Sequence, residues 1–211
     1  MPHFDSILFD LDGTLWDATS VTAGIWEIVM SRHPEIQNTI DRNTVQKYMG
    51  HTNEELALLL FPDMPFEDSY ALMMESCREE NRLLRENGGI LYPDVQDVLA
   101  KLAERYPLFI ISNCQSGYIE AFLAHHGFGH LITDHICSGD TGKSKAENIR
   151  YICCKHALES PVYVGDTNGD ATAAAKAECP FFFAYYGFGE VAAEKCDAVL
   201  SSLRDLLFLM R

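Results

Sequence analysis

The sequence has few basic residues, no long apolar run and no regular cysteine spacing. Lys and Arg together number 16 against 31 Asp and Glu, which gives a formal net charge of -15 at pH 7. Such a charge repels nucleic-acid backbones and anionic membranes, so we expect neither as a partner. The acidity still permits a small anionic substrate, because a bound metal and local cations can reverse the field inside a pocket.

The cysteine pattern and the absence of a targeting signal indicate a reducing compartment. The seven cysteines form no CxxC pair, so neither a disulfide framework nor a zinc site is indicated. The N-terminus has no basic segment followed by an apolar run, and no apolar stretch approaches the length of a membrane span. We therefore expect a cytoplasmic protein, and the sequence predicts no particular oligomeric state.

Short apolar runs alternate with amphipathic segments over most of the chain. Strands are predicted at residues 7–9, 108–111, 134–137, 162–164, 181–184 and 198–200. Helices are predicted at residues 93–106, 117–126, 145–156, 170–178 and 203–210. Strands separated by helices require crossover connections, so the predicted fold class is α/β with a parallel sheet in a three-layer arrangement.

Residues 17–87 interrupt this alternation with helical patterns only. Ile25, Ile28 and Val29 recur at helical spacing, residues 66–85 form an amphipathic pattern, and Asn53 is predicted to cap a helix over residues 54–61. Connections between a strand and a helix usually take about 2–6 residues, so this block is too long for a loop. We predict an inserted helical subdomain at 17–87 and a core made of residues 1–16 and 88–211.

Polar clusters follow four of the predicted elements at the point where a ligand crevice forms in a parallel sheet. They are Asp10-Leu11-Asp12, Ser112-Asn113, the pair Lys143 and Lys145, and the run from Gly165 to Asp170. A single acidic turn is weak evidence, because Asp and Gly are ordinary turn residues. Several reactive turns at one edge of a sheet indicate a catalytic site.

The residue types in these clusters favour metal-assisted phosphoryl chemistry. Carboxylates that converge without His or Cys are hard oxygen ligands, which suit Mg²⁺. With the metal bound, a carboxylate can act as a nucleophile toward phosphorus. A hydroxyl group and a lysine would stabilise the charge on the transferring group, and Ser112 with one of the two lysines fits these roles.

The same motifs resemble those of the haloacid dehalogenase superfamily, in its phosphatase branch with a helical cap inserted after the first motif. The resemblance rests on Asp10-Leu11-Asp12-Gly13-Thr14, on Ser112-Asn113, on a lysine before a helix, and on Gly165-Asp166-Thr167-Asn168-Gly169-Asp170. It implies a Rossmann-like core with a small all-helical cap, bound Mg²⁺, and a small phosphorylated metabolite as substrate.

The resemblance also implies a role for individual residues. Asp10 would be the nucleophile, and Asp12 the acid that protonates the leaving alcohol and later activates water. Ser112 would bind the phosphoryl oxygens, with Asn113 and Thr14 supporting the same motifs. Mg²⁺ would be held by the Asp10 carboxylate, the main-chain carbonyl of Asp12 and the Asp166 carboxylate. Asp170 would support the metal indirectly, by contacts with the groups around it.

The identity of the lysine and of the substrate contacts is less sharply specified. Lys145 is favoured because it directly precedes the helical run, and Lys143 is the alternative. His51 and Asn53 lie in a stretch that resembles the cap loop reaching into related active sites. Trp16 and Asp17 follow the first motif, and we expect them to line the cleft between core and cap.

Other functions remain open from sequence alone. A phosphomutase would pass the phosphoryl group from Asp10 to a second hydroxyl of a bound sugar. A non-enzymatic phospho-accepting module of the receiver type also uses acidic groups at strand ends, although the insert and Asp12 argue against it. The run ending in Gly142-Lys143-Ser144 lacks the first glycine of a phosphate-binding P-loop, because Cys137 stands there.

Overall fold

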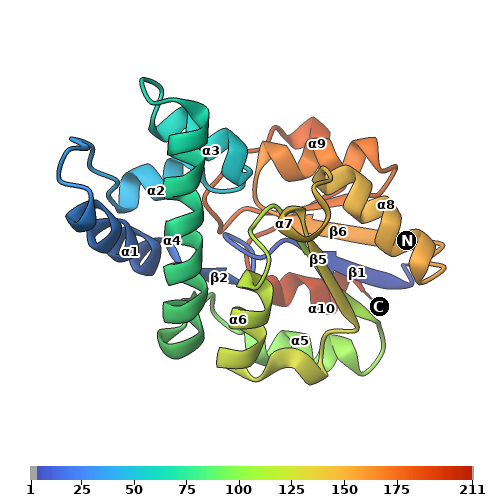
Figure 1. The fold of residues 1–211 in the computed structure, drawn as a ribbon. Helices are drawn as coiled ribbons and strands as arrows, with labels where there is room; N and C mark the ends of the chain where they lie inside the picture. The colour runs from blue at the N-terminus through green and yellow to red at the C-terminus, as the bar shows by residue number, and fades with distance from the viewer. Residues whose placement is uncertain (1–3, 211) are drawn as a thin grey trace.

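The computed structural model describes residues 4–210, and its centre is a six-stranded parallel sheet (Figure 1). The strands are β1 Ser6–Phe9, β4 Leu108–Ser112, β5 Asp134–Cys137, β6 Pro161–Gly165, β7 Phe181–Ala184 and β8 Ala198–Leu200. Their order across the sheet is β5-β4-β1-β6-β7-β8. The first strand of the chain therefore lies in the middle, where it pairs with β4 and β6.

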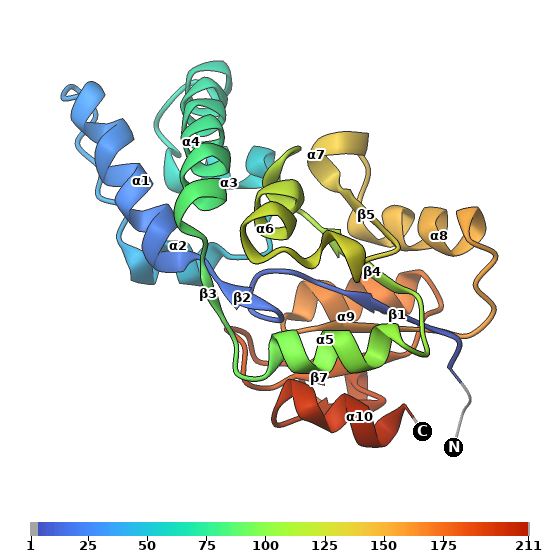
Figure 2. The same ribbon diagram turned by 90° about the horizontal axis from the view of Figure 1, so that it is seen from below.

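The central strands of the sheet are buried on both faces because their residues are mainly apolar. Ile7 and Phe9 point to one face, which is covered by α5 Val95–Ala103, α6 Tyr118–His126 and α10 Leu206–Leu209. Leu8 points to the other face, which is covered by α8 Lys145–Lys155 and α9 Asn168–Lys176. Figure 1 shows α8 and α9 above the sheet and α5, α6 and α10 below it, and Figure 2 views the molecule from the side of α5 and α10. The predicted α/β fold with a three-layer core is confirmed.

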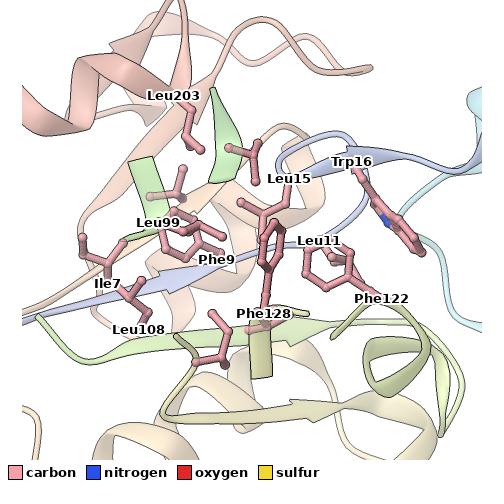
Figure 3. Close-up of a cluster of buried hydrophobic side chains, with 14 of the residues drawn as sticks. Ile7, Phe9, Leu11, Leu15, Trp16, Leu99, Leu108, Phe122, Phe128 and Leu203 are labelled. Carbon is pink, nitrogen blue, oxygen red and sulfur yellow. The ribbon is translucent and has the colours of Figure 1, made fainter. Parts of the chain in front are cut away.

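The first face contains a continuous hydrophobic core. Figure 3 shows Ile7 and Phe9 of β1 packed with Leu99 of α5 and Leu203. Trp16 lies at one end of the same cluster, and its ring makes an edge contact with Phe122 at a centroid distance of 5.0 Å. Close packing of this kind holds the loop after β1 in one position.

The inserted segment forms a separate group of four helices, which we call the cap: α1 Thr19–Arg32, α2 Arg42–Tyr48, α3 Asn53–Leu60 and α4 Phe66–Asn87. These helices have a small core of their own, with Trp26, Ile40, Ala57 and Leu72 buried together. The C-terminal half of α4 packs against α6 of the core, and Figure 1 shows the cap beyond one end of the sheet. The predicted helical cap is confirmed.

Two short strands connect the cap to the core, and the sequence did not predict them. β2 Trp16–Asp17 pairs antiparallel with β3 Ile90–Leu91, so the entry and exit of the cap lie side by side. Strands of two residues are too short to show a periodicity. The predicted boundaries, with the core at residues 1–16 and 88–211 and the cap at 17–87, stay a prediction.

Most other helices and strands agree with the predicted ranges within a few residues. The chain also contains the short helix α7 Ser138–Thr141 and the 3-10 turns η1 Phe128–His130, η2 Ala193–Lys195 and η3 Leu203–Asp205. The prediction that Asn53 caps a helix was wrong by one residue. Thr52 is the N-cap, because its hydroxyl accepts from the main-chain N–H of Glu55 while the Glu55 carboxylate accepts from that of Thr52. Among residues 4–210, the helices include none that is both long and apolar enough to cross a membrane.

Candidate active site

Three neighbouring strands deliver the main polar groups to one edge of the sheet. Asp10 directly follows β1, Ser112 is the last residue of β4, and Asp166 directly follows β6. Since β4, β1 and β6 are adjacent and parallel, these three residues lie at the same carboxyl edge. The main-chain N–H of Asp10 donates to the carbonyl of Val164 at 2.8 Å, which ties the turn after β1 to β6.

Three buried carboxylates converge at this edge. Asp10, Asp166 and Asp170 each offer an oxygen atom, and these atoms all lie within 4.8 Å of one another. Burial raises the pKa of Asp10, the nearby Asp170 carboxylate adds to that effect, and Lys145 opposes it. Burial, followed by Asp170 and Asp10, raises the pKa of Asp166 well above its usual range. A cation would relieve this repulsion.

The surroundings of Asp166 fit such a cation. Its Oδ2 accepts from the main-chain N–H of Phe188 at 2.7 Å, while Oδ1 is buried and has no hydrogen-bond partner among residues 4–210. A Cβ atom at Gly13 would lie 2.2 Å from Asp166 Oδ2, and one at Gly187 would lie 2.4 Å from Asp166 Cβ. Both glycines let the backbone close around a carboxylate that keeps one free oxygen. This oxygen, with the neighbouring carboxylates, could hold a metal ion of the hard class.

Lys145 is the lysine that reaches the carboxylates. It begins α8 behind the N-cap Ser144, and its Nζ lies 2.9 Å from Asp10 Oδ1 and 2.5 Å from Asp170 Oδ1. These two carboxylates raise the pKa of Lys145 against the effect of its burial, so it remains an ammonium ion. Lys143 is exposed in the preceding loop, with its Nζ 5.9 Å from the centre of the Tyr151 ring.

Asp12 has surroundings different from those of the three carboxylates. Its Oδ1 accepts from Trp16 Nε1 at 2.9 Å and from the Tyr118 hydroxyl at 2.7 Å. Burial raises the pKa of Asp12 to about 8, although the Tyr118 hydrogen bond opposes the shift. The side chain therefore holds a proton near neutral pH, as a general acid requires.

The other expected site residues lie around this group in different ways. Ser112 is buried, and its Oγ accepts weakly from the main-chain N–H of Cys114 at 3.4 Å. Asn113 connects cap and core, since its Nδ2 donates to the Gly50 carbonyl at 2.8 Å. The Thr14 hydroxyl is buried and has no hydrogen-bond partner within the described part of the chain.

A cavity lies between cap and core, and we call it the cap-core cavity. Asp10, Asp12 and Ser112 line its core end, and His51 and Asn53 belong to its cap wall. Trp16 and Asp17, which we expected in the cleft, are not among the described residues that line this cavity. Trp16 is fully buried against Tyr118 and Phe122, and Asp17 pairs with Arg42 at 2.8 Å.

Sequence reasoning missed three polar residues of this region. Tyr118 lies on α6 and donates to Asp12, and Gln115 precedes that helix, but neither belongs to a recognisable motif. Glu80 is buried in α4 on the same face as Met73, Cys77 and Leu84. An acidic residue at an apolar position of an amphipathic helix is a signal that could have identified Glu80 from the sequence.

Comparison with known proteins identifies the family. The sequence profile of the haloacid dehalogenase-like hydrolases matches residues 7–184, which span the β1 loop, the cap and five of the six strands of the sheet. The chain belongs to this family. The expected resemblance is thereby confirmed, and membership in a hydrolase family sets aside the non-enzymatic receiver-like alternative.

Full-length relatives agree with the assignment to the phosphatase branch of haloacid dehalogenase-like hydrolases. The phosphoglycolate phosphatase of Aliivibrio fischeri is 28% identical over 219 residues, covering 97% of this chain and 95% of that one. The phosphoglycolate phosphatase of Haemophilus influenzae is 29% identical, covering 99% of each chain. The protein is therefore a hydrolase similar to phosphoglycolate phosphatases.

Solved structures show the same fold. A predicted phosphoglycolate phosphatase from Haemophilus somnus superposes with a TM-score of 0.84 at 22% identity and covers 100% of both chains. CbbY from Rhodobacter sphaeroides, solved in complex with phosphate, superposes with a TM-score of 0.76 at 19% identity and covers 96% of each chain. At these identities the likeness concerns the arrangement of core and cap.

Proposed function

We propose that the protein is a Mg²⁺-dependent phosphatase that hydrolyses a small phosphomonoester through an aspartyl phosphate on Asp10. The observation that carries this proposal is the position of Asp10, whose carboxylate touches the Lys145 ammonium, belongs to the carboxylate triad and lines the cap-core cavity. The names of the relatives make phosphoglycolate one candidate substrate.

The first half-reaction transfers the phosphoryl group to the protein. An oxygen of Asp10 attacks phosphorus and the bond to the ester oxygen breaks. Asp12 gives its proton to that oxygen, so the alcohol leaves uncharged. The raised pKa of Asp12 supports this role, because the group carries a proton at the pH where the reaction would run. Ser112, at the end of β4, would hydrogen-bond a phosphoryl oxygen.

The second half-reaction releases phosphate. Asp12, now a carboxylate, takes a proton from water while the water oxygen attacks the phosphoryl group on Asp10. The Asp10 carboxylate leaves, and Asp12 has regained its proton. Lys145 remains beside Asp10 throughout and balances the negative charge on the reacting group.

The Asp10 and Asp166 carboxylates, with the main-chain carbonyl of Asp12, would hold Mg²⁺. When bound, the ion supplies positive charge that draws the phosphate and the Asp10 carboxylate together. The unpaired Oδ1 of Asp166 supports this assignment. Asp170 accepts from Lys145 and from the Thr167 hydroxyl at 2.6 Å, so it would orient the site.

The proposal is tested with p-nitrophenyl phosphate and Mg²⁺. Asp10→Asn should abolish turnover, whereas Asp63→Asn on the exposed cap surface should leave it unchanged. Trapped phosphoenzyme should appear in the wild type and not in Asp10→Asn. Full activity of Asp10→Asn would disprove the mechanism. Release of free phosphate, compared with formation of an isomeric sugar phosphate, separates the phosphatase from a phosphomutase.

A further inference from the structure

Glu80 places a fourth carboxylate in the cap-core cavity, outside the metal triad. It is 8% exposed, lines the cavity from α4 and has one hydrogen-bond donor on each oxygen. The Thr22 hydroxyl donates to Oε1 at 2.5 Å, and Gln115 Nε2 donates to Oε2 at 2.8 Å. A carboxylate has about four lone-pair positions, so Glu80 can accept further hydrogen bonds from a ligand.

The lining of the cavity contains acidic side chains and no strongly basic one among the described residues. No Lys or Arg lines it among residues 4–210, while Asp10, Asp12 and Glu80 do. The rest of the cap wall is mixed, with apolar side chains such as Trp26 and Met73 beside polar ones such as Thr44 and Asn53. A bound molecule therefore meets the carboxyl groups of Asp10, Asp12 and Glu80 and, on the cap side, a largely apolar wall.

Two of the nearby cations, Lys145 and Arg42, are paired with carboxylates. Lys145 is paired with Asp10 and Asp170, and these contacts place it at the phosphate end. Arg42 is paired with Asp17 at the base of the cap. His51 lies at the exposed rim, where its Nδ1 is 2.9 Å from the Tyr48 carbonyl.

We propose that Glu80 selects the leaving group, which is an alcohol without negative charge that presents a hydroxyl or ammonium donor to Glu80 and an apolar body to the cap. The proposal rests on the phosphatase function above and names the substrate class of that same site. It argues against phosphoglycolate, the candidate that the names of the relatives suggest. A carboxylate on the leaving group would lie beside Glu80 and apolar side chains, with no Lys or Arg among the described lining residues to pair with it, so the Glu80 carboxylate and desolvation both oppose it.

The first test compares three esters of similar size on the wild-type protein with Mg²⁺: 2-phosphoglycolate, 2-hydroxyethyl phosphate and O-phosphoethanolamine. The kcat/KM for 2-phosphoglycolate should be at least about tenfold below that of the other two, because like charges in an enclosed site are strongly disfavoured. Equal or faster turnover of 2-phosphoglycolate would overturn the inference. This ranking requires no variant and so does not depend on the folding of a mutant.

The second test assigns the effect to Glu80. Glu80→Gln should narrow the ratio between 2-hydroxyethyl phosphate and 2-phosphoglycolate by about tenfold, since it removes the charge and keeps the shape. Glu86→Gln, an equal change of charge on the exposed surface of the same helix, should leave the ratio unchanged. An equal loss of kcat/KM on all three esters in Glu80→Gln would show a purely structural role and overturn the assignment.

The two proposals fail in different ways. If p-nitrophenyl phosphate and all three esters resist hydrolysis, the phosphatase function itself is wrong. If all are hydrolysed and 2-phosphoglycolate is preferred, the phosphatase function stands and only the selection by Glu80 is wrong.

Discussion

The ammonium group of Lys145 lies 2.9 Å from Oδ1 of Asp10, although the two residues are 135 positions apart in the chain. The side chains are only 5% and 4% exposed. Because Lys145 also reaches Asp170 at 2.5 Å, a single ammonium ion balances two carboxylates in the interior. This contact joins the start of α8 to the end of β1, and it distinguishes between the two lysines that the sequence offered.

Replacing Lys145 by Met should lower kcat by about 10²–10³-fold, because it removes a charged donor beside the reacting group. The variant also leaves buried carboxylates unpaired, which costs about 3–5 kcal/mol of folding stability when Mg²⁺ is absent. Steady-state assays and thermal melts measure the two effects. Lys143→Met is the matched control and should resemble the wild type in both. A loss of activity in Lys143→Met alone would reverse the assignment.

Metal-free protein should become less stable as the pH rises from about 5 to 8. The pKa of Asp12 is raised from 3.8 to about 8 in the folded state, so the folded protein keeps a proton that the unfolded chain has released. The resulting stability is fully present below pH 3.8 and is lost as the pH rises through about 8. Thermal melts in EDTA should show this decline in the free energy of unfolding. In Asp12→Asn the decline between pH 5 and 8 should be smaller by on the order of a few kcal/mol. An equal slope in the variant would show that Asp12 is not the responsible group.

Mg²⁺ should stabilise the folded protein, because the carboxylates gather only in the native state. At a concentration 100 times its Kd, the ion adds about 2.7 kcal/mol, which corresponds to about 5–10 °C in Tm for a chain of this size. Asp166→Asn should lose most of this shift and most of the activity. Thermal melts with and without Mg²⁺ measure it, with Asp63→Asn as the surface control. If EDTA leaves phosphatase activity unchanged, the metal assignment is wrong.

Asn113→Ala should loosen the cap. The substitution removes the hydrogen bond to the Gly50 carbonyl and also the acceptor for the Ser138 hydroxyl, which lies 2.9 Å away. Amide hydrogen exchange at residues 48–52 should become faster, and KM should rise by about tenfold if the lost bond holds the closed form. Ser138→Ala removes only the contact within the core and should leave exchange in the cap unchanged. Equal exchange in wild type and Asn113→Ala would contradict this role.

Gly187→Ala should disturb the carboxylate triad, since the new methyl group would lie 2.4 Å from Asp166 Cβ and 2.4 Å from the Gly13 carbonyl oxygen. Both stability and the Mg²⁺-dependent shift in Tm should fall. Gly24→Ala in α1 is the contrasting substitution, because its methyl group meets no atom within 4 Å. It should stabilise the protein by up to about 1 kcal/mol through helix propensity. Unchanged Mg²⁺ binding in Gly187→Ala would show that the loop can move aside.

Much of the fold and the site could be predicted because the signals are local. Alternating strand and helix patterns gave the parallel sheet, and the strands at 134–137, 181–184 and 198–200 were predicted to the residue. The clusters at Asp10, Ser112 and Asp166 could be expected to meet because each follows a strand. The carboxyl ends of parallel strands share one edge of the sheet, so the meeting needs no further information.

The errors and omissions come from elements with weak local signals. β2 and β3 pair with each other although the whole cap separates them in the sequence. Neither short strand therefore shows a pattern by itself. The helix α2 was not predicted individually within the insert, because it is polar and has no buried residue. Asn53 is an ordinary N-cap type, but the reciprocal hydrogen bonds of Thr52 and Glu55 place the helix start one residue earlier.

The sequence by itself determined the α/β class, the inserted helices and the acidic residues at the strand ends, because these follow from periodicity and spacing along the chain. Only the tertiary structure decided that Lys145 rather than Lys143 reaches Asp10, that Tyr118 and Trp16 hold Asp12, and that Glu80 enters the cavity. These are contacts between distant segments, and their distances depend on how helices pack across the sheet and between cap and core. No local pattern encodes that packing.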